Sequence, residues 1–522
     1  MSRPAPAPIA ERPLPGAPEG PLAWPDRIGV LAGGGRLPLT IAERVIERGG
    51  SVHIVAIEGE ADPAVAGFPH TWVNWGQVGR MVSTLRRHAD ALVIAGSVRR
   101  PDLWKLRPDW GFFVSLPRIL EMMAGGDDSV LSRVVRFFEA KGITVRGAHE
   151  VAPGLLVLRG AAGALSLDRQ GLADAELGFR VRAALGALDA GQAVVTEGSR
   201  VLAIEGAEGT DAMLRRVAGQ RAARAGSAPS GVLAKGPKPG QELRVDMPTI
   251  GPRTVEGAAA AGLAGVAVEA GAVLLLDRAD AIAAANACGI AIEGLTSERD
   301  PAGKPGLQME QGAGRKVPSP LAGEGQGGGD SAQRGSDPSP RTSQISLGGK
   351  GERSDALRAP PTPGPYPQGG GEPQRAGGQR PRPTIAIAGG LQPDARGAAD
   401  IEKGLAAIEQ LAPFGTGKAV VVSRAYILGV AAAEPTLDLL ERTRALRQWG
   451  VGANRRIGVV ACRADSEGWD AAGVAALLDK AAAAGLAGVA VTGTPEALVC
   501  FERAGALADR HGLFLAIPGE QP

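Results

Sequence analysis

The sequence predicts an α/β protein: two α/β domains with a substrate cleft between them, followed by a disordered linker and a third α/β domain that resembles the second. The first observation is that short apolar runs alternate with helix-length segments over residues 26–295, a pattern typical of sheets covered by helices. The second is a stretch rich in glycine and proline, at residues 296–382, that interrupts this alternation. The third is a repeat, because segments of residues 153–295 recur in the same order within residues 383–522.

Composition excludes several classes of protein. A chain of 522 residues has room for about three or four domains of roughly 100–200 residues each. The net charge is only +2. Without a large excess of positive charge, the chain is not expected to bind nucleic acid. The three cysteines, Cys288, Cys462 and Cys500, are widely spaced, which is typical of buried thiols in a reducing compartment. The five histidines have no zinc-like spacing, so a His/Cys zinc site is not expected.

The start of the chain and its apolar runs predict a cytoplasmic protein. Residues 1–25 are rich in proline and alanine and have no apolar segment of the kind found in secretory signals, so they are predicted to form a disordered leader. No apolar run reaches the roughly 20 residues needed to cross a bilayer. The protein is therefore expected in the cytoplasm, where it can still contact a membrane surface.

Residues 26–152 are predicted to form a Rossmann-like α/β domain. Apolar runs at residues 28–32, 51–57 and 91–95 predict buried strands. The segment 128–141 predicts a helix, because an aspartate pair precedes its first turn and a glycine follows its last turn.

Residues 153–295 are predicted to form the catalytic α/β domain. Apolar runs at 193–196 and 201–204 flank a short polar turn, which predicts a β-hairpin. Further apolar runs predict strands at 231–234 and 265–268.

Residues 296–382 are predicted to be a disordered, low-complexity linker. They contain glycine runs and Ser-Pro pairs but almost no bulky apolar side chains. Such a segment cannot bury enough apolar surface to form a core.

Residues 383–522 are predicted to be a degenerate second copy of the catalytic domain. The heptapeptide at residues 262–268 recurs letter for letter at residues 485–491. Apolar runs and turn glycines are kept in the same order, so the copy is expected to keep the fold.

The second copy lacks the charged groups expected to carry chemistry. Ala431 stands where the first copy has Glu205, and Cys462 stands where it has Lys235. The charged segment 244–248 has no counterpart. We expect a catalytically inactive domain used for assembly or regulation, and we expect deletion of 296–522 to leave a soluble, active remainder.

The segment 240–254 is the strongest candidate for a site. It places acids, arginines and a glutamine on a backbone stiffened by Pro248 and Pro252, just after the basic loop that carries Lys235 and Lys238. A site that binds a phosphate together with a cation needs a carboxylate for the metal and cations for the phosphate oxygens. A solvated, charged surface loop would have the same composition.

Two loops of the first domain are candidates for anion binding. A strand runs into Gly33, Gly34 and Gly35 and then into a helix, where free amides can bind a phosphate; this is neither a Walker A nor a dinucleotide fingerprint. Arg99 and Arg100 follow another strand, and parallel strands bind ligands at their carboxyl ends. A plain strand-to-helix turn and a solvated basic turn are the respective alternatives.

Six motifs in fixed order make the sequence recognisable. They lie at residues 28–38, 96–101, 125–128, 189–195, 205–211 and 241–254. Together they resemble the LpxI-type UDP-2,3-diacylglucosamine pyrophosphatases. The resemblance covers about residues 26–295, and the linker and tail lie outside the usual family pattern.

This resemblance implies hydrolysis of UDP-2,3-diacylglucosamine to 2,3-diacylglucosamine 1-phosphate (lipid X) and UMP in lipid A biosynthesis. It implies Mg2+ or another divalent cation such as Mn2+ as cofactor, and peripheral association of a cytoplasmic protein with the inner membrane. A homo-oligomer is a possible assembly. By motif match, an essential aspartate of the family falls on Asp246.

The roles of these residues follow from the chemistry of hydrolysis. The pyrophosphate must be positioned, and the negative charge that develops on its oxygens must be neutralised. Asp246 is assigned to metal coordination or to activation of water, with Glu205 and Glu208 as second acids. The substrate-binding residues would hold or neutralise phosphate oxygens; they are Gly33, Gly34, Gly35, Arg99, Arg100, Lys235, Lys238, Gln241, Arg244 and Thr210.

Functions of other classes remain open from the residues alone. A non-catalytic nucleotide- or lipid-binding regulator would keep the glycine loop but show no turnover. A sugar-nucleotide transferase would suit an α/β cleft but needs an acceptor site. A nicotinamide oxidoreductase would need a dinucleotide fingerprint, which the sequence lacks.

Overall fold

The computed structural model describes most of three α/β domains. The described residues are 26–98, 106–123, 127–186, 188, 190–222, 227–296, 298–299, 305–306, 385–447 and 456–519. The predicted leader 1–25, most of the predicted linker 296–382, and Arg99 and Arg100 lie outside them. Within the predicted linker, β14 (Glu298–Arg299) pairs with β15 (Pro305–Gly306).

The first domain is built on a five-stranded parallel sheet in the order β3-β2-β1-β4-β5. This confirms the predicted parallel α/β layer. The strands are β1 (Arg27–Ala32), β2 (Ser51–Ile57), β3 (His70–Val73), β4 (Ala91–Ala95) and β5 (Thr144–Arg146). The helices are α1 (Leu37–Glu47), α2 (Val78–His88), α3 (Trp110–Met123), α4 (Asp127–Glu139) and α5 (Ala148–Val151), with the 3-10 turns η1 (Pro63–Gly67) and η3 (Pro153–Leu155).

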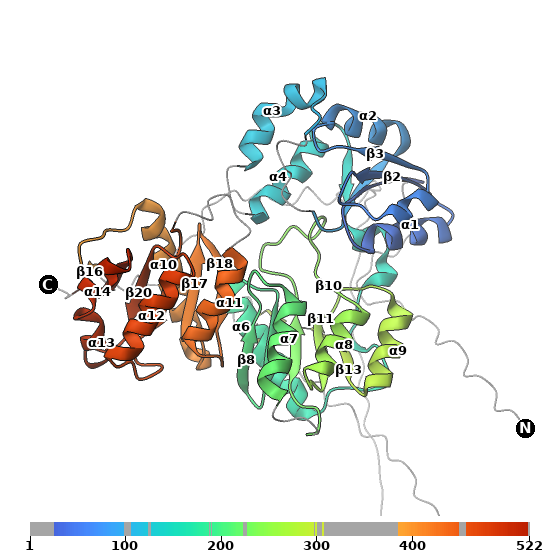
Figure 1. Cartoon of the computed structure of the whole chain (residues 1–522). Helices are drawn as coiled ribbons and strands as arrows, with labels where there is room; N and C mark the ends of the chain where they lie inside the picture. The colour runs from blue at the N-terminus through green and yellow to red at the C-terminus, as the bar shows by residue number, and fades with distance from the viewer. Residues whose placement is uncertain are drawn as a thin grey trace, which may run out of the picture. The chain divides into compact units, whose positions relative to one another are not determined.

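Both faces of this sheet are buried, which explains why its strands are continuously apolar rather than alternating. On β1, Val30 packs in one core cluster with residues of α1 and α5. Its neighbour Leu31 points to the other face and packs in a second cluster with residues of α2 and α4. Figure 1 shows this helix-covered sheet at the N-terminal, blue end of the colour scale.

The glycines after β1 are explained by packing between two loops. The amide of Gly33 donates to the Ala95 carbonyl at 2.9 Å, and Gly34 and Ser97 exchange backbone hydrogen bonds at 2.7 and 2.9 Å. A Cβ at Gly33 would lie 2.5 Å from the Ser97 carbonyl oxygen. Only glycine permits this approach, because any side chain would force the loops apart.

The second domain has a six-stranded mixed sheet in the order β6-β13-β11-β9-β7-β8. The predicted hairpin is confirmed: β7 and β8 pair antiparallel around Gly198 and Ser199, both with positive φ. The strands are β6 (Gly160–Ala161), β7 (Ala193–Glu197), β8 (Arg200–Ile204), β9 (Val232–Lys235), β11 (Gly265–Glu269) and β13 (Ala291–Leu295), and β10 (Thr249–Ile250) pairs separately with β12 (Leu274–Leu275).

Helices cover both faces of the second sheet (Figure 1). One face packs against α7 (Thr210–Arg221), α8 (Pro252–Ala260) and α9 (Arg278–Cys288), and the other against α6 (Arg169–Gly186). The polar residues that follow β8 and β9 therefore emerge at strand ends, beyond the helix-covered core.

The third domain repeats the second, as predicted. Its six strands have the same order, β16-β21-β20-β19-β17-β18. They are β16 (Ile385–Ile387), β17 (Ala419–Ser423), β18 (Tyr426–Ala431), β19 (Val459–Arg463), β20 (Gly488–Thr492) and β21 (Phe514–Pro518). The helices are α10 (Ala395–Leu411), α11 (Thr436–Arg447), α12 (Ala471–Ala483), α13 (Pro495–Glu502) and α14 (Gly505–Arg510), with the 3-10 turn η5 (Ala412–Phe414).

A buried aspartate shows why the framework persists in both copies. Asp174 accepts the backbone amides of Gly198 and Ser199, at 3.0 and 2.8 Å, in the turn between β7 and β8. Asp400 accepts the equivalent amides of Arg424 and Ala425, at 3.0 and 2.7 Å. The turn uses the same acceptor in either copy, because a buried aspartate must be satisfied by donors and these backbone amides supply them.

The third domain is not structurally independent of the second. One buried cluster combines Val181 and Leu185 of α6 with Ile401 and Ile408 of α10. The expectation that deletion of 296–522 leaves a soluble remainder was based on the linker, and the core shared by α6 and α10 argues against it. Removing the tail would expose an apolar face.

Among the described residues, no helix is long and apolar enough to cross a membrane.

We predict that Gly33→Ala destabilises the first domain by about 1–3 kcal/mol, because its Cβ overpacks against Ser97. Urea unfolding followed by the fluorescence of Trp72 and Trp75 measures this. The matched control is Gly67→Ala, where a Cβ meets nothing within 4 Å and a change of no more than about 0.5 kcal/mol is expected. Equal stability of the two variants would contradict the packing explanation.

Candidate active site

Two strand ends of the second domain bring a lysine and a glutamate together. Lys235 is the last residue of β9, and Glu205 follows β8 directly. Thr210, the first residue of α7, lies between them. Its hydroxyl donates to Glu205 Oε1 at 2.9 Å and accepts from Lys235 Nζ at 3.0 Å. Glu205 Oε2 accepts the Gln192 amide at 3.0 Å, so both carboxylate oxygens are fixed.

Lys235 is a buried cation surrounded by negative charge. Only 7% of the residue is exposed. Burial lowers the pKa of its ammonium group, because the charged form loses its hydration, while the charges of Glu205, Asp211 and Asp246 raise it. These carboxylates therefore offset part of the cost of burying the cation, and they place Asp246 within electrostatic reach of Lys235.

Asp246 is oriented by a buried glutamine. Gln241 Nε2 donates to Asp246 Oδ2 at 2.5 Å, and Gln241 Oε1 accepts the Lys238 amide at 2.8 Å. The Asp246 amide itself donates to the Glu242 carbonyl at 3.0 Å. The Gln241 side chain thus fixes one oxygen of the carboxylate, and the backbone bond fixes the main chain of Asp246, which suits a reacting group that must keep its position.

The residues on either side of Asp246 pack against the first domain. Met247 belongs to the buried cluster around α1 and β1, and Val245 packs against the cluster around α2 and α4. Arg244 pairs with Glu139 of α4 at 2.9 Å and with Glu242 at 2.8 Å. Asp246 therefore lies on a segment that packs against the first domain.

Two of the three glycine amides expected to form an anion cradle already have protein acceptors. The amides of Gly33 and Gly34 already donate to the 95–97 loop, so neither can also donate to a phosphate. Gly35, with φ of +89°, adopts a backbone conformation that favours glycine. Consecutive glycines are expected both where two loops pack closely and where the backbone approaches a ligand. Here the packing of two loops accounts for Gly33 and Gly34.

Glu208 lies in a different environment from Glu205. Its carboxylate pairs with Arg216 at 2.9 Å and with Arg442 of the third domain at 3.2 Å. These arginines engage both oxygens, so the predicted role as a second catalytic acid does not fit its surroundings.

Arg244 is also held by protein carboxylates. The hydrogen bonds that Arg244 donates to Glu242 raise the pKa of its guanidinium above the ordinary value, and the negative charge of Glu139 adds to this effect. A phosphate would have to compete with these two partners. Sequence reasoning missed Glu139, because a glutamate on an amphipathic helix carries no signal of a partner about a hundred residues away.

The carboxylates of the site limit how a metal ion could be held there. Among the residues that the structure describes, no group of three His, Cys, Asp or Glu side chains is arranged to hold a metal ion. Asp246 alone fits the mode in which Mg2+ is bound by one protein carboxylate, substrate phosphates and water. A cation bound entirely by these protein side chains does not fit.

The fold and the site define a class of protein: a multidomain α/β protein whose second domain carries a buried lysine, a threonine and two carboxylates near its junction with the first domain. The family model for the LpxI N-terminal domain matches residues 27–155. The model for the LpxI C-terminal domain matches twice, at residues 159–293 and 385–516. The chain belongs to the LpxI family, with a duplicated C-terminal domain.

A curated relative supports this assignment. The chain is 42% identical over 279 residues to a protein of Caulobacter vibrioides named UDP-2,3-diacylglucosamine pyrophosphatase LpxI. The match covers 99% of that protein and 53% of this chain. The relative therefore corresponds to little more than half of this chain.

We predict that Glu205→Gln lowers the pKa of Lys235 further, because the nearest negative charge is removed while the hydrogen bond to Thr210 can remain. The titration of 13Cε-labelled lysine by NMR, assigned with Lys235→Met, measures this pKa. Glu197→Gln is the matched control, since Glu197 pairs with Arg221 at 2.8 Å. An unchanged Lys235 pKa in Glu205→Gln would contradict the described arrangement.

Proposed function

We propose that this chain hydrolyses the pyrophosphate bond of UDP-2,3-diacylglucosamine, releasing 2,3-diacylglucosamine 1-phosphate (lipid X) and UMP. The name of the Caulobacter relative supports the substrate and the reaction class. The observation that carries the proposal is a fixed carboxylate, Asp246, whose charge acts on a buried cation, Lys235, near the junction of two domains. A pyrophosphate needs both, since its hydrolysis requires an oriented water and neutralised oxygens.

The residues of the site would have different roles, depending on whether their polar atoms already have hydrogen-bond partners. Water adds to one phosphorus, the bridging P–O bond breaks, and its electron pair leaves with the other phosphate. Asp246 would orient the water and accept its proton. Lys235 would neutralise developing charge, and its effect is strengthened by burial. Glu205 has both oxygens occupied, so it acts as a positioning residue for Thr210 and Lys235.

A divalent cation is part of the proposal. Mg2+, or Mn2+ in its place, would be held by Asp246 together with the substrate phosphates, and would supply Lewis-acid neutralisation of phosphate oxygens. Lys238 and Arg244 lie on the same segment, and we retain them as candidates for phosphate binding beside that cation.

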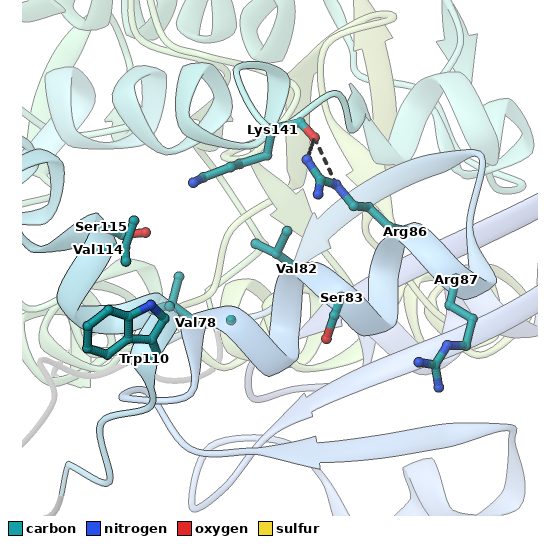
Figure 2. A pocket seen from close by; sticks show the side chains of 11 residues that line it. Val78, Val82, Ser83, Arg86, Arg87, Trp110, Val114, Ser115 and Lys141 are labelled. Carbon is teal, nitrogen blue, oxygen red and sulfur yellow. Dashed lines mark hydrogen bonds between the residues drawn. The ribbon is translucent and has the colours of Figure 1, made fainter.

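Peripheral association with a membrane is supported by a surface of the first domain. Trp110, Phe113 and Val114 of α3 are 81%, 54% and 59% exposed. Beside them a groove of about 620 Å³ is lined by apolar residues of α2 and α3 and by Arg86, Arg87 and Lys141. Figure 2 shows Trp110 and Val114 on one side of this groove and the basic side chains on the other, with Arg86 bonded to the Lys141 carbonyl.

An anionic bilayer matches this surface in both chemistry and arrangement. Tryptophan favours the headgroup region of a bilayer, and each nearby basic residue contributes about 1 kcal/mol of attraction to anionic lipid. Such docking would bring the protein to a diacylated substrate that resides in the membrane.

We predict that Asp246→Asn lowers UMP release from UDP-2,3-diacylglucosamine in Mg2+ by at least about 100-fold, with an unchanged circular dichroism spectrum. The assay is quantification of UMP by liquid chromatography. Asp470→Asn is the matched control: Asp470 caps α12 by accepting the Gly473 amide at 2.7 Å, and asparagine caps equally well. Near-normal turnover in Asp246→Asn would defeat the assignment.

The same assay separates the alternatives. Absence of UMP release from the unsubstituted protein with any divalent cation would favour the non-catalytic nucleotide- or lipid-binding regulator. Turnover that persists after chelation with EDTA would contradict the proposed role of Mg2+ while leaving the hydrolase proposal intact.

We predict that Trp110→Ala combined with Val114→Ala weakens binding to phosphatidylglycerol-containing vesicles by about tenfold or more, because each apolar side chain contributes roughly 1.5–3 kcal/mol when fully buried. Vesicle sedimentation measures the bound fraction. The control, Ile46→Ala, removes an apolar residue of α1 that is 48% exposed and should bind normally. Equal loss in both variants would contradict a specific membrane-binding face.

A further inference from the structure

The two copies of the C-terminal domain contact each other through equivalent residues. A constant offset of 226 residues relates β7 to β17, β8 to β18 and the start of α7 to the start of α11. The same offset relates two hydrogen bonds and two ion pairs between the copies, so that each of these contacts of the first copy with the second is returned by the second to the first. Reciprocity of this kind defines an isologous, two-fold interface.

Main-chain hydrogen bonds show the reciprocity directly. The Ala207 amide donates to the Leu428 carbonyl at 3.0 Å, and the Ala433 amide donates to the Leu202 carbonyl at 3.3 Å. Ala207 and Ala433 are equivalent positions, as are Leu202 and Leu428. The edge strands β8 and β18 therefore meet at their carboxyl ends, and each covers part of the other's exposed edge.

Four charged side chains repeat the pattern. Within each copy a glutamate pairs with an arginine: Glu208 with Arg216 at 2.9 Å, and Glu434 with Arg442 at 2.7 Å. Across the interface the partners are exchanged, with Arg442 3.2 Å from Glu208 and Arg216 3.6 Å from Glu434. The cluster carries two positive and two negative charges, so it is neutral and self-complementary.

An apolar core underlies these polar contacts. Val181, Leu185 and Ile204 of the first copy share a buried cluster with Ile408 and Val430 of the second. This cluster is separate from the cores on the far faces of the two sheets. If the two copies separated, this cluster would become a solvent-exposed apolar patch on each copy.

We propose that the second copy is a built-in partner that takes the place of a second subunit, so that one chain forms the equivalent of a symmetric dimer. The partner that this surface of the first copy fits is then a second copy of the same domain, supplied within the chain. When the built-in copy is displaced, the first copies of two chains pair through the same surface, because Glu208, Arg216 and Leu202 are self-complementary.

The interface also reaches the candidate active site along the chain. Ala207 and Glu208, which contact the second copy, lie in the chain between Glu205 and Thr210, and Thr210 links Glu205 to Lys235 by hydrogen bonds. Loss of the charged groups Lys235 and Glu205 from the second copy is compatible with this function, since a partner needs the interface residues and not the site.

The test uses the full chain with a specific protease site inserted between residues 309 and 382, the segment that separates the copies. After cleavage, the front and back fragments are expected to elute together from size-exclusion chromatography, with the mass of one chain by light scattering. Their separation without any further substitution would overturn the proposal.

A charge exchange confined to the second copy isolates the interface. Glu434→Arg with Arg442→Glu keeps the internal pair of that copy but faces Glu208 and Arg216 with like charges. The fragments should then dissociate, with association weakened at least about 100-fold. The released front fragment should pair with itself and show twice its own mass. A folded front fragment that stays monomeric over the whole range of roughly 0.1–10 μM would overturn the proposal.

Two further variants guard against misfolding. The mirror exchange, Glu208→Arg with Arg216→Glu, places the same repulsion on the first copy and should separate the fragments equally. All four substitutions together restore opposite charges across the interface and should restore co-elution. Association that ignores the charge exchange, or that the fourfold variant fails to restore, would contradict the proposed interface. Because the readout is mass, these outcomes do not depend on the hydrolase proposal.

Discussion

The burial of one ammonium group organises the candidate site. Lys235 ends a central strand of the second sheet, where water is excluded and a lone cation would be costly. The protein offsets that cost with the hydroxyl of Thr210 and with the charges of Glu205, Asp211 and Asp246. The elements around the site follow from this requirement: β8 and α7 deliver Glu205 and Thr210, and the segment packed against the first domain delivers Asp246.

The third domain shows the same framework without that constraint. At the position of Lys235 it has Cys462, a fully buried thiol whose pKa is raised by burial, and at the position of Glu205 it has Ala431. Cation and anion are absent together, as expected when a buried charged pair is replaced by apolar residues, because either charge alone would be left uncompensated. Asp400, Glu434 and Arg442 remain, since a turn and an interface still need them.

Much of the fold could be predicted because burial leaves a periodic signal: the parallel sheet of the first domain, the hairpin at 197–200 and the repeat all follow from apolar runs and turn residues. Asp246 and Lys235 stood out because the segment 240–254 and the loop before it concentrate charged residues, and because Asp246 falls in a motif shared with a known family. The roles predicted for Gly33, Gly34 and Glu208 did not fit the structure. Glycine signals any close approach, and the partner of Glu208, Arg442, lies more than two hundred residues away in the chain. No local pattern reports such a contact.

Joint action of Lys235 and Asp246 on one pyrophosphate is the central claim, and a double-mutant cycle on UMP release tests it most directly. Residues that act as a unit lose their effect together. The account predicts that Lys235→Met combined with Asp246→Asn is no slower than the slower single variant, within about threefold. Losses that multiply fully in the double variant would mean that the two groups act independently, and would contradict the account.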